Sequence, residues 1–330
     1  MKAVLSERPG PADLLKVAEI EMPVVTDDGV LVRVRAASVN PVDLFSLTPV
    51  RHFMRRVAAR GKPRPEVIGH DFAGTVTAVG AAVTQFHVGD EVFGAHKGAF
   101  AEYLAVPESA GVVRKPAGSG FEEAAAVPVA ALTALQAVRD HGRIQPGQRV
   151  LVNGASGGVG HFAVQIAKTL GGEVTAVCST SKVDDARALG ADHVIDYTRE
   201  DFTEGTQRYH LLIDVAGSQP WSRCVRVMEP RGTLVITGAS ALKHSAWRMI
   251  GHMAATRVAA LPGTRRALFF VAGIKRDDLG TLAEMLADGR IRPVIDARYP
   301  LCDVAGACRQ LSAGHARGKI VVNVEEAGLR

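Results

Sequence analysis

A glycine-rich turn over residues 150–160, VLVNGASGGVG, is the stretch whose residue types first suggest chemistry. An apolar run enters it, and glycines follow at positions 154, 157, 158 and 160. Such a turn lets the backbone approach a diphosphate, because glycine has no Cβ, and the next helix directs its free N–H groups at the anion. The strict G-x-G-x-x-G pattern would have glycine at 155, where Ala155 makes only a small steric difference. A turn without a ligand is the alternative, but its place between a strand and an amphipathic helix favours a dinucleotide.

The next strand, EVTAVC over 173–178, indicates which dinucleotide the chain prefers. NAD-binding proteins carry an acidic residue at this strand's end, where it binds the ribose 2′-hydroxyl. Here the strand is followed by Ser179, Thr180, Ser181 and Lys182, and the first carboxylates lie inside the next helix. Hydroxyls and an ammonium suit a 2′-phosphate, so the sequence predicts NADPH. The alternative role for Ser179 or Thr180 is capping that helix.

Composition narrows the class of protein. The chain has 330 residues, 47% apolar and 22% charged, which is typical of a globular protein of two domains. The net charge of +5 is mild and spread, so it does not indicate nucleic-acid binding. The four cysteines form no C-x-x-C pair, and the first residues form no apolar leader, which together predict a reduced cytoplasmic protein without a disulfide framework.

Two kinds of pattern divide the chain. The first hundred residues contain short valine-rich runs bounded by Gly, Pro and Asp, which predict a β domain, interrupted over residues 45–66. After a helix predicted over 121–140, apolar strands alternate with helical segments as far as a strand at 266–273, and the last segment returns to strands. The alternation predicts a parallel sheet with helices on both faces.

Several motifs together make the chain resemble the medium-chain dehydrogenase/reductase superfamily, in its zinc-free, quinone-oxidoreductase-like branch. The resemblance covers essentially the whole chain and implies an α/β protein with a GroES-like β-barrel catalytic domain and a Rossmann domain. Its expected boundaries are 1–118 and 276–330 for the catalytic domain and 119–275 for the NADP-binding domain. The motifs that carry the resemblance are ASVNPVDL (37–44), VIGHDFAGTVTAVG (67–80), FHVGDEVFG (86–94), AALTALQAV (130–138), VLVNGASGGVGHFAVQIAK (150–168), LGADHVIDY (189–197), IDVAG (213–217) and the terminal GKIVVNV.

The same resemblance implies the site residues. Asn40 and Asp43 are the candidates for catalysis, although Asp43 is equally compatible with a buried structural role. Phe45 stands where related reductases often have a tyrosine, so that position offers no proton. The implied cofactor-binding residues are Asn40, Thr133, Ala155, Ser156, Gly157, Gly158, Val159, Ser179, Ser181, Lys182, Tyr197, Ala216, Gly238, Ala239 and Lys319.

The ligands of a catalytic zinc are missing from the sequence. Zinc-dependent members of the superfamily use a Cys, a His and a third ligand, and of these this chain keeps His70. Asn40 stands at the cysteine position, and the third position lies in an apolar stretch. One histidine does not hold a metal that needs three protein ligands, so we predict no metal site and a hydrogen-bonded packing role for His70.

Without a Lewis acid, hydride transfer to a polarised acceptor is easier than alcohol oxidation. We therefore predict reduction of a quinone or of the C=C bond of an α,β-unsaturated carbonyl, with NADPH as cofactor and a small hydrophobic substrate. The alternatives are a zinc-free ketone reductase or alcohol dehydrogenase, and a non-catalytic NADPH sensor. An apolar edge strand at 266–273 predicts a homodimer.

Two basic segments, 51–64 and 242–266, have no assigned role. A solvated helix face and packing at the rim of the site is the simpler interpretation. The functional alternatives are an apolar lining for the substrate and a shallow contact with a membrane surface.

Overall fold

The computed structural model describes residues 1–58, 65–237, 264–314 and 316–324. The chain forms two compact units: Met1–Ala130 together with Ile274–Arg330, and Ala131–Gly273. The first unit is thus built from both ends of the chain. Among the described helices, none is long and apolar enough to cross a membrane.

The first unit contains a seven-stranded sheet that orders its strands β15-β16-β3-β5-β6-β8, with β7 paired to β3. Its pairs are antiparallel except β15 with β16, which are parallel. A second sheet, β2-β1-β4, is antiparallel. The strands are β1 (Lys2–Ser6), β2 (Lys16–Glu19), β3 (Gly29–Val39), β4 (Glu66–Val67), β5 (Asp71–Val79), β6 (Glu91–Ala95), β7 (Tyr103–Pro107), β8 (Val112–Arg114), β15 (Ile295–Pro300) and β16 (Lys319–Asn323).

Strand β3 explains how both chain ends build one core. It pairs with β5 and β7, and it also pairs with the returning strand β16 through Val39 and Ile320. Fully buried Phe72, Phe93 and Phe100 fill the interior against these strands, which removes a large apolar area from water. The return of β16 beside the end of β3 places Lys319 next to Asn40.

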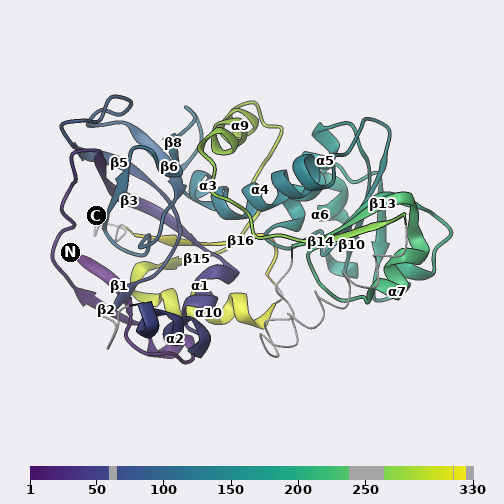
Figure 1. Ribbon diagram of the computed structural model, residues 1–330, viewed down its shortest axis with the longest axis horizontal. Coiled ribbons are helices and arrows are strands. Elements are labelled where there is room, and N and C mark those ends of the chain that lie inside the picture. The colour runs from purple at the N-terminus through teal and green to yellow at the C-terminus, as the bar shows by residue number, and fades with distance from the viewer. Residues whose placement is uncertain (59–64, 238–263, 315, 325–330) are drawn as a thin grey trace. The chain divides into compact units, whose positions relative to one another are not determined.

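Helices complete the first unit and carry the chain into the second (Figure 1). The helix predicted over 121–140 is interrupted, because Pro128 starts a new helix and a π-helical turn follows over Gln136–His141. The helices of this part are α1 (Pro41–Ser46), α2 (Pro49–Ala58), α3 (Phe121–Ala126), α4 (Pro128–Leu135), α9 (Arg276–Ala287) and α10 (Val304–Ala313), with 3₁₀ turns at Ala12–Leu14 and Leu301–Asp303.

The second unit contains a six-stranded parallel sheet in the order β11-β10-β9-β12-β13-β14. This order runs outward in both directions from the first strand, as in the doubly wound dinucleotide-binding fold. Its strands are β9 (Arg149–Asn153), β10 (Glu173–Cys178), β11 (His193–Asp196), β12 (Tyr209–Asp214), β13 (Met228–Ile236) and β14 (Arg266–Phe269). Its helices are α5 (Gly160–Thr169), α6 (Val183–Ala188) and α7 (Trp221–Cys224), with 3₁₀ turns at Thr180–Lys182, Phe202–Glu204 and Val225–Val227.

The predicted fold class, a β domain from both chain ends and a Rossmann sheet, is confirmed. The strand predicted over 266–273 is shorter than expected and ends at Phe269. Neighbouring strands β9 and β12 are connected on opposite sides of the sheet, so their carboxyl ends form the switch point where such folds bind ligands.

Candidate functional site

The glycine-rich turn begins directly after β9. Gly154 has φ +85°, in the left-handed region that favours glycine, and a Cβ there would lie 3.2 Å from the backbone nitrogen of Ala216. A Cβ on Gly160 would lie 2.1 Å from the carbonyl oxygen of Gly154, which is closer than any real contact. The turn therefore requires glycine at both positions, because backbone packs directly on backbone.

Helix α5 starts from this turn, so its first N–H groups have no partner inside the helix. Ser156, Gly157, Gly158 and Val159 lie between the strand and the helix, and Ala155 beneath them is fully buried. Gly157 leaves room: a Cβ there would lie no closer than 3.4 Å to its nearest neighbour, the Gly154 carbonyl oxygen. The positive end of the helix dipole and an open backbone surface make this turn fit a diphosphate.

Strand β12 contributes the opposite side of the switch point. Its last residue, Asp214, is buried and accepts hydrogen bonds from the Asn153 side chain at 2.8 Å and from the Gly217 N–H at 2.7 Å. The Ala216 N–H donates to the Asn153 carbonyl at 3.3 Å. These bonds hold the segment after β12, which contains the predicted cofactor-binding residue Ala216, against the glycine turn.

The residues predicted for the adenosine end lie at one edge of the same sheet. Cys178, the last residue of β10, pairs with Asp196 of β11, and the Tyr197 N–H donates to the Cys178 carbonyl at 3.0 Å. Ser179, Ser181 and Lys182 follow in or beside a 3₁₀ turn, while the Tyr197 side chain is exposed. The structure brings these predicted residues together.

Asp196 is a residue that the sequence analysis missed. Its carboxylate accepts hydrogen bonds from the Thr180 hydroxyl at 2.5 Å and the Thr198 hydroxyl at 2.7 Å, and Arg199 Nε lies 3.4 Å away. The Thr180 bond is the main reason that the pKa of Asp196 lies below its usual value. Parallel pairing of β10 with β11 places this carboxylate beside the end of β10. The sequence analysis considered only the residues that follow β10 in the chain, and Asp196 lies on the neighbouring strand.

A buried polar network occupies the first unit. The Asn40 backbone N–H donates to Asp43 Oδ2 at 2.7 Å, which caps helix α1, and His70 Nδ1 lies 2.6 Å from Asp43 Oδ1. Asp43 is fully buried, whereas the His70 side chain is 19% exposed. The prediction that His70 is hydrogen-bonded is confirmed, and Asp43 fixes which side of the imidazole faces the protein.

The same network ties in the C-terminal strand. Asp71 accepts from the Asn40 side chain at 2.8 Å, the Ser38 hydroxyl at 2.9 Å and the Val129 N–H at 2.9 Å. Lys319 is 2% exposed; its Nζ lies 3.3 Å from Asp71 Oδ2 and donates to Asn40 Oδ1. The Asn40 side chain is thus fully engaged inside the protein.

The charges of this network favour a protonated histidine. Two buried carboxylates, Asp43 and Asp71, face one ammonium, Lys319, which leaves one negative charge. Burial by itself lowers the pKa of His70, but the hydrogen bond and charge of Asp43, with the charge of Asp71, outweigh it and raise that pKa. Burial also raises the pKa of Asp43, so both members of the Asp43–His70 pair are shifted toward holding a proton.

The remaining predicted residues are distributed as follows. Thr133 lies on α4 and belongs to the second unit, whereas Asn40 and Lys319 belong to the first. Gly238 and Ala239 lie outside the described residues, as do 59–64 of the first basic segment and all but the last residues of the second. Within the ranges that the structure describes, no group of three or more His, Cys, Asp or Glu side chains is arranged to hold a metal ion.

Comparisons with known proteins agree with this arrangement. Residues 26–117 match the family described as alcohol dehydrogenase GroES-like domain, and residues 189–322 match the one described as zinc-binding dehydrogenase. The chain is 34% identical to the 2-methylene-furan-3-one reductase of Solanum lycopersicum, over 95% of this chain and 76% of that protein. It is 33% identical to the chloroplastic NADPH-dependent alkenal/one oxidoreductase of Arabidopsis thaliana, over 98% of this chain and 79% of that protein.

Among solved structures, the chain is similar to the quinone oxidoreductase from Coxiella burnetii. The TM-score is 0.87 at 27% sequence identity, and the match covers 98% of this chain and 99% of that one. The similarity therefore extends over both units.

Proposed function

Because this chain belongs to the medium-chain dehydrogenase/reductase superfamily, in its quinone-oxidoreductase-like branch, we propose that it is a zinc-independent, NADPH-dependent reductase of quinones or of the C=C bond of α,β-unsaturated carbonyls. The chain is an oxidoreductase of the nicotinamide-dependent class. The observation that carries the proposal is the glycine turn at the switch point, where Gly154 and Gly160 leave no room for side chains and α5 begins.

The second unit supplies the binding residues in this proposal. The N–H groups at the start of α5 hold the diphosphate, and Ala216 borders it from the neighbouring strand. Ser179, Ser181 and Lys182 hold the 2′-phosphate, because hydroxyl and ammonium groups donate to it. Thr180, Thr198 and Arg199 engage the Asp196 carboxylate, so its charge opposes the phosphate less. When bound, the nicotinamide supplies the hydride.

The first unit supplies the proton in this proposal. His70 donates from Nε2, since Asp43 occupies the space at Nδ1, and the proton that leaves balances the hydride added to the substrate. Asp43 is a positioning residue that holds the imidazole and favours its charged form. Asn40 holds Asp43 and Asp71 in place rather than contacting the reacting atoms.

Independence from zinc is supported by the residue type and the hydrogen bonds of Asn40. An amide stands at the position of a cysteine ligand, and it already binds Lys319 and Asp71. A metal at this point would need to displace a buried ammonium. Hydride transfer with a protonated histidine needs no Lewis acid, because the imidazolium stabilises the charge that develops on the carbonyl oxygen.

The test is oxidation of NADPH by purified protein with quinones, enones and saturated ketones, together with metal analysis of the same sample. We expect turnover with quinones or enones, a lower KM for NADPH than for NADH, and less than stoichiometric zinc. Turnover with saturated ketones alone refutes the proposed reaction. Cofactor binding without turnover of any acceptor identifies a sensor instead.

We also propose that the protein is a homodimer. Strand β14 ends the parallel sheet, and antiparallel pairing with the same strand of a second copy satisfies its outer backbone groups. Light scattering after size-exclusion chromatography is expected to give twice the chain mass of 34.9 kDa. A Leu268→Pro variant, which removes a strand N–H, is expected to shift the mass toward the monomer.

A further inference from the structure

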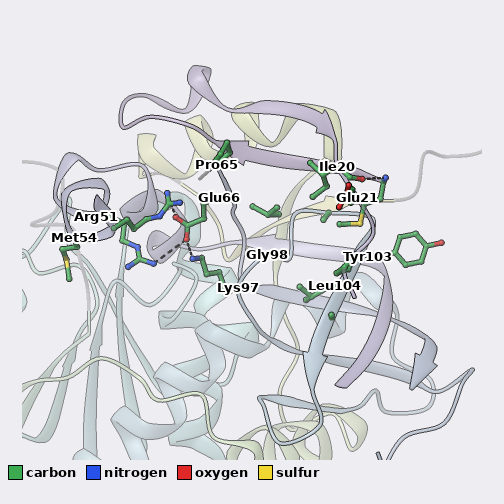
Figure 2. Close-up of a pocket in the computed structure, with 16 residues that line it drawn as sticks. Ile20, Glu21, Arg51, Met54, Pro65, Glu66, Lys97, Gly98, Tyr103 and Leu104 are labelled. Carbon is green, nitrogen blue, oxygen red and sulfur yellow. Dashed lines mark hydrogen bonds and ion pairs between the residues drawn. The ribbon is translucent and has the colours of Figure 1, made fainter. Parts of the chain in front are cut away.

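A pocket of about 930 Å³ lies in the first unit and is lined by none of the residues of the His70 network. Helix α2, strand β4 and the segments around Ile20 and Lys97 surround it (Figure 2). Its volume falls within the range of small-molecule sites, about 300–1,000 Å³. Its lining contains no residue to which the proposed reaction assigns a role.

Three cations converge on one carboxylate in this pocket. Glu66 is buried on β4, which pairs with β1, so its backbone position is fixed by the sheet. Arg55 Nη1 lies 2.7 Å from Glu66 Oε2, Arg51 Nη2 lies 3.5 Å from Oε1, and Lys97 Nζ also contacts Oε1. Figure 2 shows the Arg51 and Lys97 side chains pointing at Glu66 from two directions.

The pocket has a positive charge that Glu66 does not cancel. The charged groups of the lining are Arg51, Arg55, Lys97 and the N-terminal ammonium of Met1 against Glu21 and Glu66, which leaves two positive charges. Of the three cations at Glu66, Arg51 keeps the most hydrogen-bond donors for a ligand. A guanidinium carries five donors, and the contact of Arg51 with Glu66 has the length of an ion pair rather than of a hydrogen bond. Its side chain is 31% exposed, so the donors are accessible.

Beside this charged end, the pocket has an apolar wall. Ile20, Val67 and Leu104 line it. Met54 extends from the same helix as the two arginines and lies on the other side of them from Ile20 and Leu104 (Figure 2). A ligand that carries an apolar chain would cover the half-buried Ile20 and Val67, which is favourable because it removes apolar surface from water.

We propose that this pocket binds a single-chain aliphatic carboxylate, with its head on Arg51 and Lys97 and its chain along the wall that contains Ile20, Val67 and Leu104. A guanidinium binds a carboxylate through two parallel hydrogen bonds. An alkylammonium would add to the positive charge of the lining.

The experiment is isothermal titration calorimetry of the full chain with decanoate below its micelle concentration, in the absence of NADPH. We expect saturable binding at one site. Octanoate is shorter by two methylenes, and each methylene removed from water contributes about fourfold in affinity. We therefore expect octanoate to bind more weakly than decanoate, by up to about sixteenfold. Decyltrimethylammonium, with the same chain and opposite charge, is expected not to bind.

Two matched variants locate the head group. Arg51→Gln is expected to weaken decanoate binding about tenfold or more, whereas Arg56→Gln removes the same charge from an exposed position of α2 outside the pocket and is expected to leave affinity within about twofold. Unfolding temperatures of both variants check that they fold. Should Arg51→Gln fail to fold, the exposed Lys97→Gln takes its place.

Four results overturn the proposal. They are absence of decanoate binding by the wild-type chain, equal weakening by Arg51→Gln and Arg56→Gln, equal affinity for the alkylammonium, and binding to phosphatidylglycerol vesicles without binding of free decanoate. The last result would identify a membrane surface as the partner. None of these measurements needs turnover, so they are independent of the outcome for the proposed reaction.

Discussion

The buried lysine of the returning strand offers the sharpest test of the network in the first unit. In Lys319→Met the chain keeps similar volume but loses the ammonium that faces Asp71 Oδ2 at 3.3 Å. At this distance, an effective dielectric constant of about 20 gives an attraction of about 5 kcal/mol. Part of it offsets the desolvation of both charges, and removing one partner of a buried pair destabilises a protein by about 3–5 kcal/mol. For a unit of this size we expect the unfolding temperature to fall by about 6–20 °C.

Differential scanning calorimetry is the suitable assay. The two tryptophans of the chain, Trp221 and Trp247, both belong to the sequence of the second unit, so their fluorescence does not report the first. The double variant Asp71→Asn with Lys319→Met is expected to regain much of the lost stability. The Asp71→Asn change removes the uncompensated charge, and with the ammonium gone the Asn40 amide is free to turn its oxygen toward the amide introduced at position 71.

Lys16→Met is the matched control, because Lys16 forms an exposed ion pair with Glu7 at 2.9 Å. We expect the control to leave the unfolding temperature nearly unchanged, because an exposed ion pair contributes little to stability. An equally small change in Lys319→Met would refute the argument. So would strict additivity of the substitutions at 71 and 319, since residues that interact directly show a coupling energy in a double-mutant cycle.

Three further predictions follow from the two sites. Gly160→Val is expected to abolish NADPH binding, measured by fluorescence titration, because its Cβ would lie 2.1 Å from the Gly154 carbonyl oxygen. Lys182→Gln is expected to raise the KM for NADPH about fivefold or more while leaving that for NADH within about twofold, because in the proposed site the ammonium binds a 2′-phosphate that NADH lacks; equal effects on both would contradict the proposed role. His70 has a folded-state pKa raised above its unfolded value, so its bond to Asp43 stabilises the protein fully below the unfolded pKa, and this contribution disappears as the pH rises through the folded pKa. Urea unfolding should therefore show a larger advantage of wild type over His70→Gln at about pH 5.5 than at about pH 9, and a constant difference would contradict the pairing.

The diphosphate turn was predictable from the sequence because its requirement is steric and local. Close approach of backbone to backbone at Gly154 and Gly160 needs residues without a Cβ, and the residue types alone show this. The alternation of strands and helices likewise fixes a parallel sheet, because short connections leave few ways to bury continuous apolar strands. The position of residues 179–182 at the end of β10 was predictable because they follow that strand directly.

Features that depend on pairing between distant segments were not predictable in this way. Asp196 reaches the end of β10 only because β11 lies beside that strand in register. The Glu66 cluster requires α2, β4 and the segment at Lys97 to meet, although the sequence showed the arginines as one basic run. Pro128 is a residue that ends or begins helices, so the break of the predicted helix could have been inferred from it. The apolar helical pattern continues on both sides of Pro128, and the sequence analysis therefore predicted a single helix.

The network around His70 shows why the chemistry of the first unit depends on the last strand. Asp43 and Asp71 come from the first quarter of the chain, and without Lys319 they would place two buried negative charges beside one imidazole. With Lys319 present the excess is one charge, which one proton on His70 neutralises. In the proposed reaction, His70 gives up this proton when negative charge develops on the substrate. The returning strand contributes the cation that pairs with Asp71, one of the two carboxylates whose charge raises the pKa of His70.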